Sequence, residues 1–209
     1  MVWDMVFHEN TSIIRIVKRF SSIILGQFYG HTHYDEFSLL YNNHSEAISV
    51  AYTAPSLTPH DGLNPGYRIY HVDGKRQDSS HVLLDHETYY FNLDELNAES
   101  EHNIKYKMEY SAKSSLEMKD LTPESWSQYV NELVVDDSKW EEFHQHYTRH
   151  GPASQKKSSL CSGKCKQEII CRLVTFDSGD QTMCHAVKLL ISQNEFQTDE
   201  NDNWWEEDF

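Results

Sequence analysis

The sequence predicts an α/β fold in which a β-structured first part precedes a helical second part. Three observations carry this prediction. Apolar and β-branched runs alternate with turn residues between residues 22 and 93, which is typical of strands. Beyond residue 120, apolar residues recur at helical spacing instead, and four cysteines fall within 24 residues. At 209 residues the chain can hold one large domain or two small ones.

The strands are justified in chain order. Residues 22–29 form an apolar run that predicts a buried strand ending at Gly30. Residues 37–41 and 48–52 are separated by a polar stretch, which predicts a hairpin. The last predicted strands cover residues 67–72, 81–84 and 87–93, the first two flanking the turn pair Asp73-Gly74. Together the strands predict the rear half of a β-sandwich that lacks its partner strands.

The helices follow. Thr122 is expected to cap a helix with Pro123 at its first position. Its apolar residues recur at i, i+3, i+4 and i+7, namely Trp126, Tyr129, Val130 and Leu133. A second helix is expected from Asp137 to Gly151-Pro152. Two more are predicted at residues 164–175 and 180–192, after a linker rich in Ser and Lys.

Charge and hydropathy exclude some classes of partner. The net charge of −15 makes nucleic acid an unexpected partner, because phosphate binding needs clustered Lys and Arg. Residues 194–209 hold seven acidic residues and no basic one. We interpret them as a disordered acidic tail, although their aromatic residues leave a docking tip as the alternative. No transmembrane segment is expected, and the first residues do not resemble a signal peptide.

The cysteines and two sequons suggest the secretory route. Cys161, Cys165, Cys171 and Cys184 have the spacing C-x3-C-x5-C-x12-C, which permits three disulfide pairings, with a zinc site as the competing explanation. Zinc sites favour paired C-x2-C knuckles, and these are missing from the pattern. Asn10 and Asn43 begin glycosylation sequons. Sequons are common by chance, so the cysteines are the better evidence for that route.

The residues Gly30-His31-Thr32-His33 follow the first predicted strand. Glycine lets the chain turn sharply and brings its backbone near an ion. In extended backbone, residues i and i+2 point to one side, so both imidazoles could reach two neighbouring metal ions. The alternative is that His31 and His33 are ordinary loop residues among 13 histidines. The tetrapeptide alone leaves both interpretations open.

Longer segments carry a family resemblance. The run Gly-His-Thr-His-Tyr-Asp-Glu-Phe from residue 30, together with residues 54–56, 62–70 and 79–90, closely resembles the acid sphingomyelinase family, the sphingomyelin phosphodiesterases of lysosomes and secretions. The resemblance covers about residues 13–190 and is strongest up to residue 93. It implies that residues 1–93 are the carboxyl-terminal part of a calcineurin-like metallophosphoesterase domain. Residues 94–193 would then form a disulfide-bonded helical domain, followed by the tail at 194–209.

The resemblance also implies site residues. His31 and His33 would be ligands of a centre with two zinc ions, whose other ligands come from earlier family motifs. No Asp-x-His or Gly-Asn-His occurs in these 209 residues, and the general-acid histidines of the family have no counterpart, so no catalytic residue is assigned. His60 would lie at the substrate-pocket rim. The implied disulfides are Cys161–Cys165 and Cys171–Cys184.

Two further pairs of residues are given no role in the reaction. His146 and His150 stand four apart, but no carboxylate or cysteine is arranged by the sequence to complete a metal site, so we interpret them as surface histidines. Asp35 and Glu36 lie just after the His pair, and carboxylates at such a position could act as acid–base catalysts. We interpret them as part of the signature that carries the resemblance, without a catalytic role.

Three hypotheses for function follow. The first is part of a zinc-dependent phosphodiesterase that hydrolyses sphingomyelin to ceramide and phosphocholine, secreted or lysosomal in its full-length form and inactive as this chain. Its partners would be sphingomyelin or another phosphodiester lipid and, indirectly, the membrane surface. The second is a non-catalytic secreted module that binds lipid or protein. The third is a related phosphodiesterase that acts on nucleotides.

Overall fold

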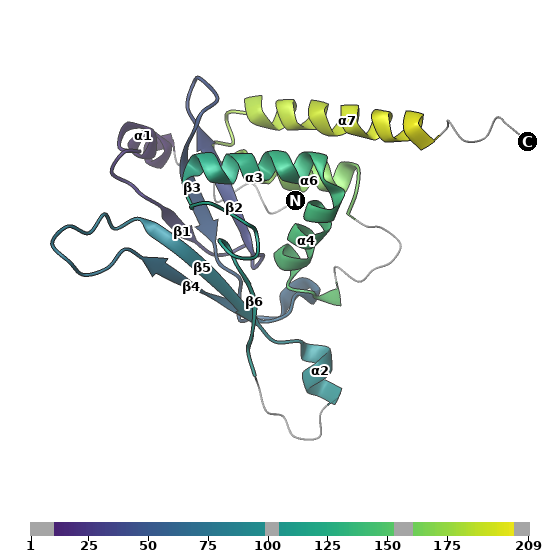
Figure 1. The fold of residues 1–209 in the computed structure, drawn as a ribbon, viewed down its shortest axis with the longest axis horizontal. Coiled ribbons are helices and arrows are strands. Elements are labelled where there is room, and N and C mark those ends of the chain that lie inside the picture. Colours follow the sequence, from purple (N-terminus) through teal and green to yellow (C-terminus); the bar gives the residue numbers. More distant parts are fainter. Residues whose placement is uncertain (1–10, 99–104, 153–160, 203–209) are drawn as a thin grey trace, which may run out of the picture.

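The computed structural model describes residues 11–98, 105–152 and 161–202 and contains a first sheet of three strands (Figure 1). Strands β2 (Glu36–Tyr41) and β3 (Ala47–Thr53) form the predicted hairpin, and β1 (Gln27–Tyr29) pairs in parallel with β3. The strand order is β1-β3-β2. Because β1 lies at the edge beside β3, the turn that follows it lies at the carboxyl end of both parallel strands.

The prediction of a strand at residues 22–29 is wrong for most of its length. Only Gln27–Tyr29 are in the sheet, and the side chains of Ile23 and Leu25 are 71% and 46% exposed. An apolar run becomes a strand only where a neighbouring strand satisfies its backbone groups. In this chain β3 pairs with only three residues of the predicted strand, Gln27–Tyr29.

The second sheet is antiparallel and has the order β4-β5-β6. Strand β4 (Gly66–Val72) agrees with the prediction, whereas the strands predicted at 81–84 and 87–93 are one strand, β5 (Leu83–Tyr90). Strand β6 (Lys107–Ser111) was not predicted. It lies beyond the predicted domain boundary at residue 93, so the sheet draws on both predicted domains.

The helices largely follow the prediction. Thr122 caps α3 (Pro123–Val135), and its side chain accepts a hydrogen bond from the Ser125 backbone N–H. Helix α4 (Asp137–Thr148) ends three residues before the predicted Gly151-Pro152. Its C-cap residue is Arg149, whose backbone is in the left-handed region. The remaining helices are α1 (Thr11–Arg19), the one-turn η1 (His60–Gly62), α2 (Leu93–Ala98), α6 (Lys164–Leu173) and α7 (Thr182–Asp202). Helix α7 therefore continues into the predicted disordered tail, while residues 203–209 lie outside the described residues.

One core joins the first sheet to the helices. Helix α3 contacts β2 and β3, α6 contacts β2, and α7 packs on α3 and α6. In Figure 1 these helices gather at one side of the strands, whereas β4 and β5 project away from them. Phe37 packs on Trp126 with ring centroids 4.2 Å apart, and the Trp126 indole N–H donates to the Tyr52 hydroxyl at 2.9 Å. The core thus continues across the predicted boundary at residue 93.

Both disulfides implied by the resemblance are present in the helical part. Cys161 is bonded to Cys165, and Cys171 to Cys184, which joins α6 to α7. No free cysteine occurs among the described residues. The predicted sequon residue Asn43 is exposed in the β2–β3 turn, and Asn10 lies outside the described part of the chain.

We expect the Cys171–Cys184 bond to stabilise the chain more than the Cys161–Cys165 bond. The two bonds join residues 13 and 4 positions apart, and closing a loop of 15 residues restricts the unfolded chain by about 3 kcal/mol. Replacing Cys171 and Cys184 together by alanine should lower the melting temperature by about 6–12 °C. Calorimetry of this variant beside the Cys161→Ala/Cys165→Ala control checks the order of the two effects, and the reverse order would contradict the loop-length argument.

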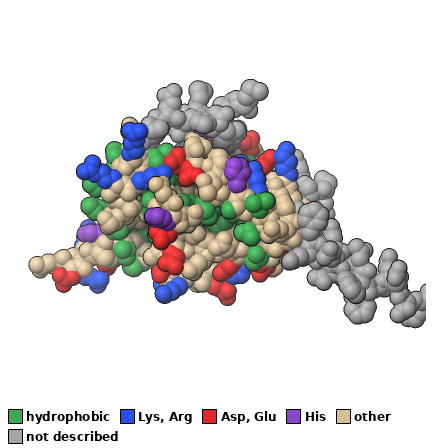
Figure 2. All heavy atoms as spheres, turned by 90° about the horizontal axis from the view of Figure 1, so that it is seen from above, with side chains coloured by type: hydrophobic (Ala, Val, Ile, Leu, Met, Phe, Trp, Pro, Cys, Tyr) green, Lys and Arg blue, Asp and Glu red, His purple; other side chains and the backbone are tan. Residues whose placement is uncertain are grey.

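Several apolar side chains on the strands remain exposed. Phe28 of β1 and Met108 of β6 are each 54% exposed, and Leu84 of β5 is 48% exposed. On the face shown in Figure 2, acidic, basic and apolar side chains are interspersed. Within the described residues, no helix has the length and apolar character needed to cross a bilayer.

Candidate functional site

The turn after β1 holds His31 and His33. Their φ angles are 89° and 67°, so neither residue has the extended backbone that the sequence argument assumed. Histidine adopts positive φ more readily than most residues, but such conformations cost energy and need support from the surrounding structure. His31 is exposed and His33 is partly buried.

His60 lies beside this turn. The rings of His33 and His60 meet edge to face with centroids 5.6 Å apart. His60 begins η1, and its Nδ1 lies 3.1 Å from Oδ2 of Asp61, which also has a positive φ of 55°. The structure thus brings together two of the predicted site residues from segments 27 positions apart in the chain. The rim role of His60 stays a prediction.

A buried arginine supports the turn from the far end of α4. Nη1 of Arg149 donates to the backbone oxygen of His33 at 2.9 Å, and its Nε donates to the backbone oxygen of Asn64. In return, the Asn64 side-chain amide donates to the Arg149 carbonyl at 2.9 Å. Close by, a Cβ added to Gly151 would lie 2.1 Å from the Gly62 oxygen, so the two backbones touch. Arg149 therefore fixes the His turn and the loop after η1 to the end of α4.

Asp35 is the centre of a buried hydrogen-bond network. Arg68, Thr88 and Tyr110 all donate to its carboxylate, Thr88 at 2.9 Å and Tyr110 at 2.8 Å. The Asp35 and Arg68 side chains are only 3% and 2% exposed. Burial alone lowers the pKa of Arg68, but the adjacent Asp35 outweighs burial and raises that pKa. Through these buried contacts Asp35 joins the turn region to the second sheet.

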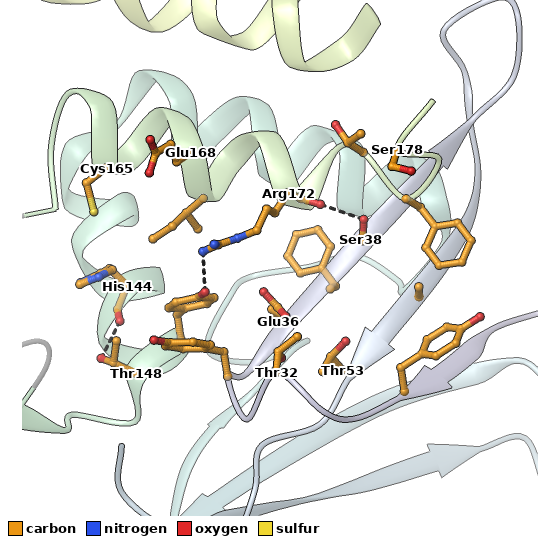
Figure 3. A pocket seen from close by; sticks show the side chains of 18 of the residues that line it. Thr32, Glu36, Ser38, Thr53, His144, Thr148, Cys165, Glu168, Arg172 and Ser178 are labelled. Atoms are coloured by element: carbon orange, nitrogen blue, oxygen red, sulfur yellow. Dashed lines mark hydrogen bonds between the residues drawn. The ribbon is translucent and has the colours of Figure 1, made fainter. Parts of the chain in front are cut away.

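Glu36 points instead into a cavity of about 700 Å³ beside the His turn (Figure 3). The cavity is also lined by Thr32 of the turn and by Arg172 of α6. Burial raises the pKa of Glu36, and the nearby Arg172 partly opposes this effect. Arg172 Nη2 donates to the Tyr147 hydroxyl at 2.7 Å, which holds its guanidinium at the cavity wall. Glu36 and Arg172 thus face the cavity together with two further acidic residues, Asp61 and Glu168.

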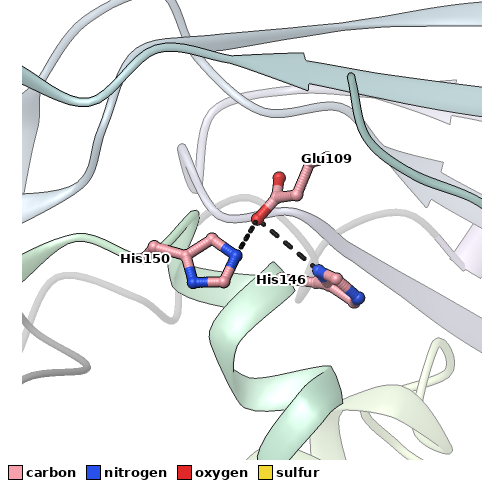
Figure 4. Close-up of side chains that lie close together, drawn as sticks. All are labelled: Glu109, His146 and His150. Atoms are coloured by element: carbon pink, nitrogen blue, oxygen red, sulfur yellow. Dashed lines mark ion pairs between the residues drawn. The ribbon is translucent and has the colours of Figure 1, made fainter. Parts of the chain in front are cut away.

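A cluster around Glu109 corrects the interpretation of His146 as a surface histidine, because His146 is buried, whereas His150 is partly exposed. Glu109 of β6 lies between them, and their ligand atoms lie within 4.8 Å of one another (Figure 4). The sequence could not show this carboxylate, because β6 was not predicted. Among the residues that the structure describes, this is the one group of three His, Cys, Asp or Glu side chains with converging ligand atoms, and it does not contain His31 or His33. The His31 and His33 assignment stays a prediction.

Comparison with known proteins identifies a family match that begins in the β2–β3 turn and ends in helix α7. The family model described as "Acid sphingomyelin phosphodiesterase C-terminal region" matches residues 45–190, which is more than half of the chain. The chain belongs to this family.

Curated relatives extend this result. The chain is 37% identical over 172 residues to a Bos taurus protein named sphingomyelin phosphodiesterase, covering 81% of this chain and 27% of that protein. It is 34% identical to the Homo sapiens sphingomyelin phosphodiesterase, covering 81% and 26%. It is 32% identical over 183 residues to a Bos taurus cyclic GMP-AMP phosphodiesterase, covering 85% and 39%. The chain thus spans well under half the length of each.

Proposed function

We propose that this chain forms the carboxyl-terminal part of a zinc-dependent phosphodiesterase that hydrolyses sphingomyelin to ceramide and phosphocholine. One observation carries the proposal: the family's paired-histidine turn is held at the carboxyl end of β1 by Arg149. Because Arg149 binds the backbone oxygen of His33 and not its side chain, this contact leaves the His33 imidazole available as a ligand. Imidazole nitrogen suits zinc, although each zinc needs about three protein ligands.

The contribution of this chain would be positioning. His31 and His33 would each supply a nitrogen to the zinc pair, and His60, in contact with His33, would shape the approach to it. When bound, the zinc ions would lower the pKa of a bound water and stabilise the charge that develops at phosphorus. The remaining ligands and the general acid would come from the part of the family that this chain does not span. Secretion or lysosomal delivery is part of the proposal, and the two disulfides support it.

The exposed apolar side chains of β1, β5 and β6 support the proposal that this chain is one part of a larger domain. Phe28, Leu84 and Met108 are each about half exposed on strands, where a completed sandwich would cover them. This observation favours a part of an enzyme over a self-contained binding module. A nucleotide remains the second candidate substrate, because a relative at 32% identity is named a cyclic GMP-AMP phosphodiesterase.

We expect the purified chain, supplied with zinc, to hydrolyse neither sphingomyelin nor a cyclic dinucleotide above the rate of zinc alone. Two histidines leave both metal ions without enough ligands, and no general acid is in place. Phosphocholine release and loss of the cyclic dinucleotide are the measurements. Zinc-dependent turnover that disappears in the His31→Ala variant would show that the chain is complete without further ligands.

A chimera tests the positive half of the proposal. The Bos taurus sphingomyelin phosphodiesterase is expressed with its matching carboxyl-terminal segment replaced by residues 11–194 of this chain. Sphingomyelin hydrolysis is expected, and His31→Ala or His33→Ala should each lower kcat/KM more than about 100-fold, beyond the usual effect of losing a residue that only orients a metal ligand. His44→Ala, in the exposed β2–β3 turn, is the matched control. A chimera that keeps its activity without both histidines would remove them from the site.

A further inference from the structure

Three side chains converge at the junction of the second sheet and α4. Nδ1 of His146 and Nε2 of His150 both lie 3.5 Å from Oε1 of Glu109. Figure 4 shows the carboxylate pointing between the two imidazole rings. Metal–ligand bonds of about 2.0–2.1 Å at a tetrahedral angle place ligand atoms about 3.3–3.4 Å apart. The two measured separations are therefore close to those between ligands of one zinc ion.

Burial makes this arrangement costly without a ligand. The Glu109 side chain is 1% exposed, and neither of its oxygens has a hydrogen-bond partner. Both ring nitrogens of His146 are also buried without a hydrogen bond. Burial raises the pKa of Glu109 to about 7, although His146 opposes this shift. A buried carboxylate needs a cation or hydrogen-bond donors, and a bound metal ion would satisfy the carboxylate and both imidazoles.

The backbone is strained where it delivers His150. Arg149 and His150 have φ angles of 50° and 49°, so two consecutive residues other than glycine are left-handed. Two hydrogen bonds hold this conformation, from Arg149 N–H to the His146 oxygen and from His150 N–H to the Gln145 oxygen, both at 3.0 Å. His150 therefore faces Glu109 from the turn after α4 and not from the helix itself. Strain of this kind is maintained where the structure over-determines it, often at functional sites.

Aromatic rings fix the two histidines in place. Tyr110 stacks on His146 with centroids 4.3 Å apart, and Tyr90 lies against His150 at 5.4 Å. The ligands thus come from β6, from α4 and from the turn after it. Rigid support from several elements is what a metal site needs to keep its geometry.

We propose that Glu109, His146 and His150 bind one divalent transition-metal ion of the zinc class. Two nitrogen ligands and one carboxylate favour zinc over calcium or magnesium, which prefer all-oxygen sites. Three protein ligands leave a fourth position for water. This site is separate from the predicted His31 and His33 pair and does not depend on it. Because Arg149 stands between His146 and His150 in the chain and binds the His33 carbonyl, the ion would stabilise the support of the His turn.

The test uses the full chain carrying His31→Ala and His33→Ala, so that the predicted catalytic pair cannot contribute. Equilibrium dialysis against zinc should give one ion per chain. Cobalt should give the visible absorption of a four-coordinate ion. Zinc at about 100 times its Kd should raise the melting temperature by about 5–10 °C.

Two variants made in this background decide the outcome. Glu109→Gln and His150→Gln should each weaken zinc binding about 100-fold or more and abolish the cobalt spectrum. His185→Gln, on the exposed surface of α7, is the matched control and should bind like the background. The His150 side chain is 36% exposed, so its variant gives a result even if Glu109→Gln does not fold. Equal zinc binding by His150→Gln and the background, or no retained zinc, would overturn the proposal and leave the cluster as groups that share protons.

Discussion

Replacing Asp35 with alanine is expected to lower the free energy of unfolding by about 3–5 kcal/mol. The substitution leaves the Arg68 guanidinium, whose side chain is 2% exposed, as a buried charge without its counter-ion. It also removes the acceptor for the hydroxyls of Thr88 and Tyr110. Since small proteins are stable by only about 5–15 kcal/mol, a large fraction of the chain should be unfolded under mild conditions. Urea denaturation followed by circular dichroism measures the change.

Two comparisons separate this effect from a general loss of a carboxylate. Asp78→Ala removes an exposed acid from the β4–β5 loop and should change stability by less than about 0.5 kcal/mol. The double variant Asp35→Leu/Arg68→Met removes both charges and should be less destabilised than the sum of the single variants. An Asp35→Ala protein as stable as Asp78→Ala would show that the network contributes little.

Replacing Arg149 with methionine is expected to destabilise the chain by about 2–5 kcal/mol and to release the His turn. The backbone oxygens of His33 and Asn64 lose their buried donor, and each unsatisfied group costs about 1–3 kcal/mol. Lysine should not rescue the variant, because one ammonium cannot reproduce the two directions of the guanidinium fork. In the chimera, the displaced turn should lower kcat/KM by about 100-fold.

Thermal unfolding and chimera kinetics measure the two consequences separately. The matched control is Arg76→Met, which removes a guanidinium that is 69% exposed in the β4–β5 loop. Arg76→Met should leave both quantities near those of the parent. A chimera with Arg149→Met that keeps full activity would show that the turn does not need this support.

Local patterns predicted the elements whose stability is local. The hairpin of residues 36–53 was recognised from two apolar runs around a polar turn, and Thr122-Pro123 marked the start of α3 because both residues act within the first turn of the helix. The disulfide pairs followed from the family resemblance. Strand β5 was split in the prediction because Asp85 and His86 interrupt its apolar pattern, yet His86 is fully buried.

The candidate sites were less predictable because they depend on distant segments. The Asp35 network joins residues up to 75 positions apart, and no local pattern shows which arginine will reach the carboxylate. Glu109 meets His146 only because β6 pairs with β5, and the polar segment that contains β6 carried no strand signal. A sequence search for His pairs four apart followed by a test of every nearby acid in a structure would have found this cluster.

The hydrogen bond from Arg149 to His33 spans 116 positions of the chain. It therefore has consequences for the order of folding. During synthesis, His33 leaves the ribosome long before Arg149 exists, so the His turn cannot adopt its supported conformation while the first sheet is forming. Contacts of such long sequence separation are closed late, since the entropy of the intervening chain must be lost first. The support that Arg149 gives to the His33 backbone is thus complete only once the end of α4 has docked, which makes it a late event in folding.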